Sequence, residues 1–226
     1  MNSTDVIQLR RFATGLDAPT VGTNEAQRAD CAPLGSGGDG NINAGDVVQG
    51  RRFATGLDPI TGATGPPMSA QVEDRATSVL DDIYAYFFGR KIAVGNLDAR
   101  NATSVTVPID ITSFGEERAV GFTLEYDPSV LSDPRVALGE LAGDGAILTV
   151  NSNEKGRIVI LIDAENSLVR NAGSGQIVTI TFNVAEGTSG VTPIRFNSAS
   201  AATGVSDQLG ATLSTRWLDG SVRVGE

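Results

Sequence analysis

The chain has 226 residues, enough for one large domain or two small ones, and a formal net charge of −10. This acidity argues against binding of nucleic acid, because like charges repel. With no histidine and a single cysteine, the sequence excludes Ser-His-Asp triads, Cys-His dyads, zinc sites built from several Cys or His ligands, and a disulfide within the chain. Since it has neither a membrane-length apolar stretch nor a signal peptide, we expect no transmembrane segment, and a chain that is either already processed or part of a longer precursor.

The amino-terminal part contains an internal repeat. Residues 2–17 return as residues 43–58, at an offset of 41 residues, and the segment RRFATGLD is identical in both copies. Repeated units of this kind generally exist because one unit alone cannot bury its apolar face. We therefore expect residues 1–60 to form a small helical module in which the two copies pack against each other.

Each copy of the repeat predicts one short helix. Asp5 and Asp46 are expected at the N-cap, where a carboxylate accepts the unpaired amide protons of the first turn. Apolar residues then follow at helical spacing. Gly15 and Gly56 are expected to end the two helices.

The segment before the second helix resembles half of a calcium loop. From Gly40, the spacing to Asp46 is that of the second half of the EF-hand pattern, with Asp replacing the final Glu. Glycine permits the sharp turn there, and Asp, Asn and backbone oxygens are the hard ligands that Ca²⁺ prefers. The predicted ligands are the side chains of Asp39, Asn43 and Asp46, the backbone carbonyl of Asn41, and Asp30 if residues 31–38 enlarge the loop. A plain Gly/Asp turn that caps a helix is the alternative.

These residues resemble the type I dockerin family, whose signature is two calcium loops of the form DxNxDGxxNxxD, each followed by a helix. The second copy matches from Asp39 onward and departs before it, because glycines stand at the first two ligand positions. The first copy keeps only the last two loop ligands, Asn2 and Asp5. The resemblance implies an EF-hand-like helical module that binds Ca²⁺ over about residues 1–60. Its first site is empty or completed by another molecule, unless the missing half-loop lies upstream.

Residues 61–90 are predicted to be a linker. Two glycines and two prolines within residues 61–67 cannot sustain a helix or a central strand. An aromatic cluster follows, and an exposed cluster of this kind often marks a binding surface that could add a strand to a neighbouring sheet. It consists of Tyr84, Tyr86, Phe87 and Phe88. The alternative is that this cluster packs on the chain's own carboxyl-terminal domain.

The carboxyl-terminal part has the periodicity of β-strands. Apolar residues alternate with polar ones through residues 105–111, 120–126 and 178–184, as in strands with one buried face. Ile158–Ile162 is instead a continuous apolar run, which predicts a strand buried on both faces. We predict a mainly β fold, an antiparallel jelly-roll sandwich of about eight or nine strands over residues 91–226.

Five segments in this part look like the cohesin family in the expected order: residues 94–96, 104–109, 120–131, 175–184 and 219–222. Cohesins are binding modules without catalysis, and they dock dockerins on one face of a sheet. The resemblance therefore implies a protein-binding sandwich, but it assigns no individual contact residue, because cohesin contacts vary among exposed strand positions.

Three functions are consistent with the sequence. The first is a secreted or cell-surface bacterial structural protein, stabilised by Ca²⁺, whose copies associate head to tail into a filament or scaffold. The second is a surface-attachment module of a larger secreted protein, which pairs within one chain or binds another cohesin or dockerin-type protein. The third is a carbohydrate-binding sandwich, which a single tryptophan, Trp217, makes less favoured. The acidic pair Glu116-Glu117 could serve a glycosidase, but we expect it to be solvated in a loop and the protein not to be an enzyme.

Overall fold

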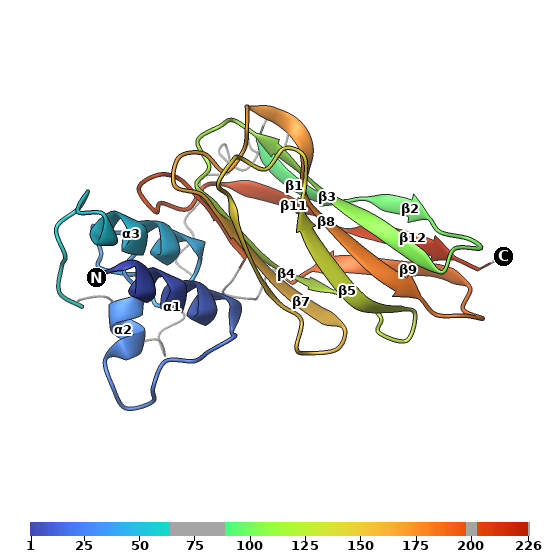
Figure 1. Cartoon of the computed structure of the whole chain (residues 1–226), viewed down its shortest axis with the longest axis horizontal. Helices are drawn as coiled ribbons and strands as arrows, with labels where there is room; N and C mark the ends of the chain where they lie inside the picture. Colours follow the sequence, from blue (N-terminus) through green and yellow to red (C-terminus); the bar gives the residue numbers. More distant parts are fainter. Residues whose placement is uncertain (64–88, 198–202, 226) are drawn as a thin grey trace, which may run out of the picture.

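The computed structural model describes residues 1–63, 89–197 and 203–225, and these form a helical module beside a β-sandwich (Figure 1). The helical module contains α1 (Ser3–Thr14), α2 (Glu25–Ala29) and α3 (Ala44–Ala54). The two helices predicted from the repeat are α1 and α3. The short helix α2 was not predicted. None of the helices within the described residues is long and apolar enough to cross a membrane.

The sandwich contains two sheets. One has the strand order β11-β1-β3-β8-β5, and the other has the order β2-β12-β9-β4-β7-β6, with β10 paired to β4. The strands are β1 (Arg90–Val94), β2 (Asn96–Asp98), β3 (Ser104–Ser113), β4 (Ala119–Glu125), β5 (Leu131–Leu138), β6 (Ile147–Asn151), β7 (Arg157–Asp163), β8 (Gly173–Val184), β9 (Gly190–Phe196), β10 (Gly204–Ser206), β11 (Thr215–Leu218) and β12 (Gly220–Val224).

The predicted β-sandwich is confirmed, and most of its strand pairs are antiparallel. Two pairs are parallel, β1 with β11 and β2 with β12. Both involve short strands at the edge of a sheet, and the described residues contain twelve strands rather than eight or nine. Short edge strands carry weak alternation, which is why the sequence pattern did not reveal all of them.

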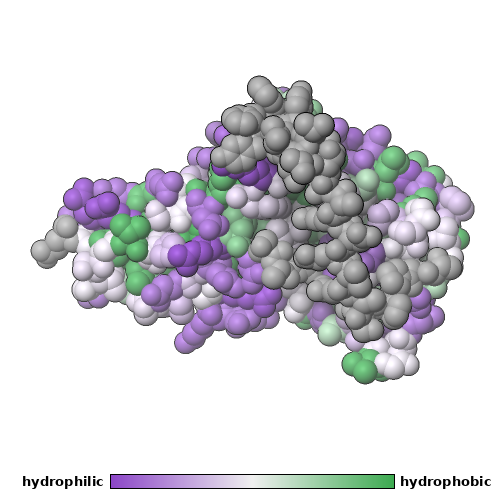
Figure 2. All heavy atoms as spheres, turned by 180° about the vertical axis from the view of Figure 1, so that it is seen from behind, coloured by the Kyte–Doolittle hydropathy of each residue, from purple (hydrophilic) through white to green (hydrophobic). Residues whose placement is uncertain are grey.

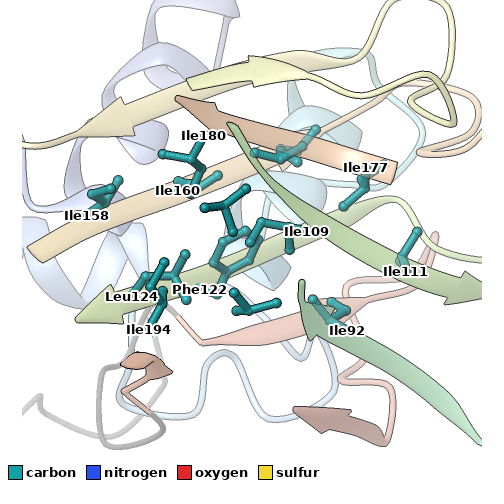
Figure 3. Packing of buried hydrophobic residues seen from close by; sticks show 14 of the residues in the cluster. Ile92, Ile109, Ile111, Phe122, Leu124, Ile158, Ile160, Ile177, Ile180 and Ile194 are labelled. Atoms are coloured by element: carbon teal, nitrogen blue, oxygen red, sulfur yellow. The ribbon is translucent and has the colours of Figure 1, made fainter. Parts of the chain in front are cut away.

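The main core lies between the two sheets, where large aliphatic side chains from both inner faces interdigitate (Figure 3). The residues labelled there come from β1, β3, β4, β7, β8 and β9: Ile92, Ile109, Ile111, Phe122, Leu124, Ile158, Ile160, Ile177, Ile180 and Ile194. Five of these ten positions belong to the period-two segments of the sequence, so the alternating pattern correctly identified the inner faces of β3, β4 and β8.

Strand β7 is buried on both faces, as its continuous apolar run predicted. Ile158, Ile160 and Ile162 point into the core between the sheets. Leu161 belongs instead to a second apolar cluster, which it shares with α1 and α3. The outer face of this sheet is therefore covered by the helical module.

The prediction that Asp5 and Asp46 are the N-cap residues is wrong by three residues, almost one helical turn. The N-caps are Asn2 and Asn43, and the two aspartates occupy the third helical position. Each asparagine side chain accepts amide protons of the first turn, and each aspartate accepts the backbone N–H of its asparagine, at 2.7 Å for Asp5 and 2.8 Å for Asp46. Both residue types favour helix starts, and this reciprocal capping box decides between them. Gly15 does end α1 in a left-handed conformation, while α3 is capped by Thr55, one residue before Gly56.

Candidate functional site

Helices α1 and α3 lie against the outer face of the sheet formed by β4, β7 and β6, and α3 also contacts β10. In Figure 1 the helices stand beside these strands at one end of the sandwich. The contact is apolar at its centre. Its buried members are Val6, Leu9, Ala13, Ala29, Ile42, Ala44, Val47 and Val48 from the helical module, and Ala119 and Leu161 from the sheet.

A buried carboxylate from the sheet binds both helices. Asp163, at the end of β7, has a side chain with 0% exposure. Arg10 of α1 donates two hydrogen bonds to it, Nε to Oδ1 at 2.8 Å and Nη2 to Oδ2 at 2.9 Å. Arg51 of α3 donates to the same carboxylate through Nη2. We call Arg10, Arg51 and Asp163 the arginine clamp.

The two arginines of the clamp are equivalent positions of the sequence repeat, 41 residues apart. Equivalent positions of the two copies therefore bind the same carboxylate. Burial lowers the pKa of Arg10, and burial together with the nearby charge of Arg10 lowers the pKa of Arg51. Their side chains are only 11% and 16% exposed, and Asp163 is the carboxylate that compensates both charges, with a further favourable interaction between Glu165 and Arg51.

The second arginine of each RRFATGLD segment binds an aspartate of its own copy. Arg11 donates to Asp17 at 2.5 Å, and Arg52 donates to Asp58 at 2.6 Å. A glutamine from the same helix joins each pair, Gln8 at Asp17 and Gln49 at Asp58. The hydrogen bonds from Arg52 and Gln49 lower the pKa of Asp58 to about 2. The identical repeat thus encodes one arginine for the sheet and one for closing the turn after each helix.

Close backbone approaches complete the edge of the contact. The Asn151 side chain of β6 donates to the carbonyl oxygen of Thr14 at 2.9 Å, and Arg52 donates to the carbonyl oxygen of Gln208 at 3.1 Å. A Cβ atom at Gly45 would lie 2.7 Å from the Gly210 carbonyl oxygen. Glycine at position 45 therefore lets the start of α3 approach the loop between β10 and β11.

The predicted calcium ligands of the first copy do not form a site with those of the second. Asn2 and Asp5 are both exposed at the start of α1 and are bonded to each other's backbone through the capping box. Asn43 likewise uses its side-chain oxygen to accept the Gly45 amide at 2.7 Å. Each asparagine oxygen that was predicted to face a cation instead caps a helix.

In the second copy, Asp30, Asp39 and Asp46 belong to one loop but serve separate groups. Asp30 and Asp46 are buried and accept backbone amide protons, whereas Asp39 is exposed and accepts the amide of Asn41 at 2.9 Å. Burial is the main cause that raises the pKa of Asp30 and that of Asp46. Within residues 1–63, 89–197 and 203–225, no three acidic, histidine or cysteine side chains gather so that they could hold a metal ion. The arrangement does not fit the calcium-ligand set expected from the sequence.

The acidic pair and the single tryptophan discussed from the sequence lie in the described part of the chain, whereas the aromatic cluster does not. Glu116 is exposed as expected, but Glu117 is fully buried, where it binds Arg90 and accepts the amide of Gly115 at 3.0 Å. Both residues lie in the loop between β3 and β4, as expected, but only the side chain of Glu116 is solvated. Trp217 packs against Phe196, with ring centroids 5.0 Å apart. The aromatic cluster of residues 84–88 lies outside the described residues.

The residue that sequence reasoning missed is Asp163. Its signal was present, because an aspartate ends the apolar run of β7 and the repeat carries an unexplained first arginine in each copy. Nothing local in the sequence joins these positions, which are 153 and 112 residues apart.

Comparison with known proteins agrees with the sandwich geometry. The family model for the cohesin domain matches residues 91–224. The chain belongs to the cohesin family. Cohesin domains are non-catalytic protein-interaction modules that bind dockerins. The search of the curated proteins found no match.

Solved cohesin structures share the fold. A type I cohesin–dockerin complex of OlpA from Clostridium thermocellum is 18% identical, with a TM-score of 0.51, and the match covers 60% of this chain and 98% of that chain. The third cohesin of ScaC from Acetivibrio cellulolyticus, solved with the ScaB dockerin, is 20% identical with a TM-score of 0.51 and coverages of 61% and 99%. At these identities the likeness concerns the fold of the cohesin domain alone. The arginine clamp is a feature of this chain.

Proposed function

We propose that the protein is a non-catalytic assembly protein of the cell exterior, whose dockerin-like helical module binds the β4-β7-β6 face of a cohesin domain. The arginine clamp is the observation that carries this proposal. Without the helices, Asp163 would place a carboxylate beside the apolar surface of Leu161 and Ala119 on an open sheet. Exposed apolar surface beside polar groups often marks an interaction site, and the two arginines supply the charge that compensates this buried carboxylate.

The same contacts can join separate copies. In the structure, the helices dock on the sheet of their own chain, so each copy carries both halves of one interface. If the helices of one copy dock on the sheet of the next, the contact is heterologous, and repeating it builds a linear filament unless the rotation closes a ring. We propose that head-to-tail association of this kind is the function, with other copies as the partner.

A second candidate function follows from the closed arrangement itself. Because the clamp is satisfied within one chain, the module can also remain monomeric and act as a surface-attachment module of a larger secreted protein. In that case the helical module stabilises the sandwich, and another surface binds the partner. The surface of the described residues in Figure 2 intersperses hydrophobic with hydrophilic residues and shows no single broad apolar area.

Complementary variants distinguish the two functions. Asp163→Ala keeps the arginines but loses their acceptor, whereas Arg10→Gln combined with Arg51→Gln keeps the acceptor but loses the donors. Neither variant can form the clamp alone, in one chain or between identical chains. A mixture of the two can form it only between chains.

We expect wild-type protein to form filaments that are visible by negative-stain electron microscopy at high concentration. We expect the mixture of variants to give one-to-one dimers by size-exclusion chromatography with light scattering. The matched control is Asp98→Ala mixed with Arg100→Gln, since that ion pair lies exposed near β2. Monomers in every sample would refute association between copies and favour the attachment module.

A further inference from the structure

The loop between α2 and α3 is closed by two carboxylates that bind opposite sides of it. Asp30, at the start of the loop, accepts the amide of Asp39 at 2.9 Å and the amide of Gly40 at 2.7 Å. Asp46, in the first turn of α3, accepts amides from the beginning of the loop. Asp30 thus binds the end of the loop that leads to α3, and Asp46 binds the end that follows Asp30.

Asp46 is the more heavily bonded of the two. One of its oxygens accepts the amides of Cys31 at 2.6 Å and Ala32 at 2.8 Å, and the other accepts the amide of Asn43 at 2.8 Å. The equivalent Asp5 of the first copy is exposed and accepts the Asn2 amide at 2.7 Å. In the second copy, Asp46 also accepts the amides of the two residues that follow Asp30, and its carboxylate is buried.

Glycines let the loop backbone close on Asp30. A Cβ atom at Gly38 would lie 2.5 Å from Oδ1 and 2.6 Å from Oδ2 of Asp30, and Gly38 has a φ of +125°, which L side chains rarely adopt. Gly40 has a φ of +90° and donates its amide to Asp30. The backbone itself thus occupies the space next to the carboxylate, where a calcium loop would place its cation.

We infer that residues 30–46 form a calcium-independent loop, in which five backbone amides bind Asp30 and Asp46 in place of a metal ion. Amide hydrogen bonds favour the charged form of a carboxylate, as a cation does, and at Asp30 and Asp46 they oppose the rise in pKa that burial causes. The calcium-loop spacing from Gly40 to Asp46 is explained by the turn and by the capping box of α3, which need the same residues at the same spacing. The exposed side chain of Asp39 does not close the loop. It only accepts the amide of Asn41 in a short turn.

The test is thermal unfolding of the whole chain, followed by the far-ultraviolet helical signal in calcium chloride and in excess EGTA. We expect the helical transition of the wild type at the same temperature in both solutions. Asp46→Asn removes one carboxylate acceptor and should lower the folding equilibrium constant of the helical module roughly tenfold or more, equally in both solutions, because charge-assisted hydrogen bonds contribute about 1.5–3 kcal/mol each. Asp30→Asn should act in the same way.

Asp39→Ala is the discriminating control. Alanine removes the side-chain oxygen that a calcium loop needs just before its glycine, whereas asparagine could replace it. Because Asp39 is an exposed turn residue, we expect its substitution to leave the transition almost unchanged. Calcium titration by isothermal calorimetry completes the test. A calcium-dependent rise in melting temperature that Asp30→Asn, Asp39→Ala or Asp46→Asn abolishes would overturn the inference. A rise that survives all three variants arises from ions bound outside this loop and supports it.

Discussion

Replacing Asp163 with alanine should release the helical module from the sandwich. The substitution removes the carboxylate to which both Arg10 and Arg51 are hydrogen-bonded at the interface. Removing one partner of a buried ion pair costs roughly 3–5 kcal/mol. Because the two guanidinium groups keep 11% and 16% exposure and can turn toward water, we expect the lower end, about 3 kcal/mol. This corresponds to roughly a 100-fold fall in the docking equilibrium constant.

Native-state hydrogen exchange is the appropriate assay, because it separates opening of the interface from global unfolding. Amides of α1 and α3 should lose protection in the variant, while amides of β3 and β8, in the opposite sheet, should keep theirs. Asp98→Ala removes an exposed ion pair and should change protection at neither place, since such pairs contribute at most about 1 kcal/mol. Unchanged protection of α1 and α3 in Asp163→Ala would refute the assignment of the clamp as the determinant of docking.

Three further predictions concern the interface and the sandwich. Leu161→Ala truncates a side chain that is 2% exposed beneath the helices and should weaken docking by about 2–3 kcal/mol, measured by the same exchange experiment; unchanged exchange in α1 and α3 would contradict it. Gly45→Ala favours the helical backbone of α3 but places a Cβ 2.7 Å from the Gly210 carbonyl oxygen. It should therefore weaken docking, measured by the same exchange experiment, without loss of helical circular dichroism. Tighter docking would contradict this and show that the loop between β10 and β11 moves to accept the methyl group. Burial tends to raise the pKa of Glu117, but hydrogen bonds from Ser113 and Arg90 outweigh it and hold the pKa below its ordinary value. Its contribution to stability is therefore present above about pH 4.3 and lost as the pH falls through the lower folded-state pKa, so Glu117→Gln should flatten the acid limb of the urea-midpoint profile, and an unchanged slope would count against this role.

The helices and strands could be predicted from local sequence wherever one buried face gave the apolar residues a regular spacing. Alternation identified the inner faces of β3, β4 and β8, and the unbroken apolar run of β7 indicated that a second layer covers it. The repeat identified α1 and α3 and their tendency to pack as a pair. Each of these signals depends on residues that are close in sequence, which is why each could be predicted.

The docking geometry could not be predicted, because it joins positions that are distant in the chain. Arg10 and Asp163 are separated by 153 residues, and their pairing follows from the way the sheet orders β4, β7 and β6. The burial of Glu117 beside Arg90 has the same origin. In the loop before α3, the spacing of Asp and Asn is typical both of a calcium loop and of a turn that caps a helix. A backbone amide can bind a carboxylate as a cation does, so the sequence does not distinguish the two.

The position of the helical module also has a mechanical consequence. The described amino and carboxyl ends lie at opposite ends of the molecule, with the helices at one end and β12 leading to the other (Figure 1). Tension applied between these ends passes in series through the helix–sheet contact and the sandwich, so both carry the same load. Two hydrogen-bonded arginines and a small apolar contact yield more easily than a sheet whose strands must be sheared. The helix–sheet contact would thus act as a force-sensitive joint that opens while the cohesin domain stays folded, and it could re-form when the load is removed.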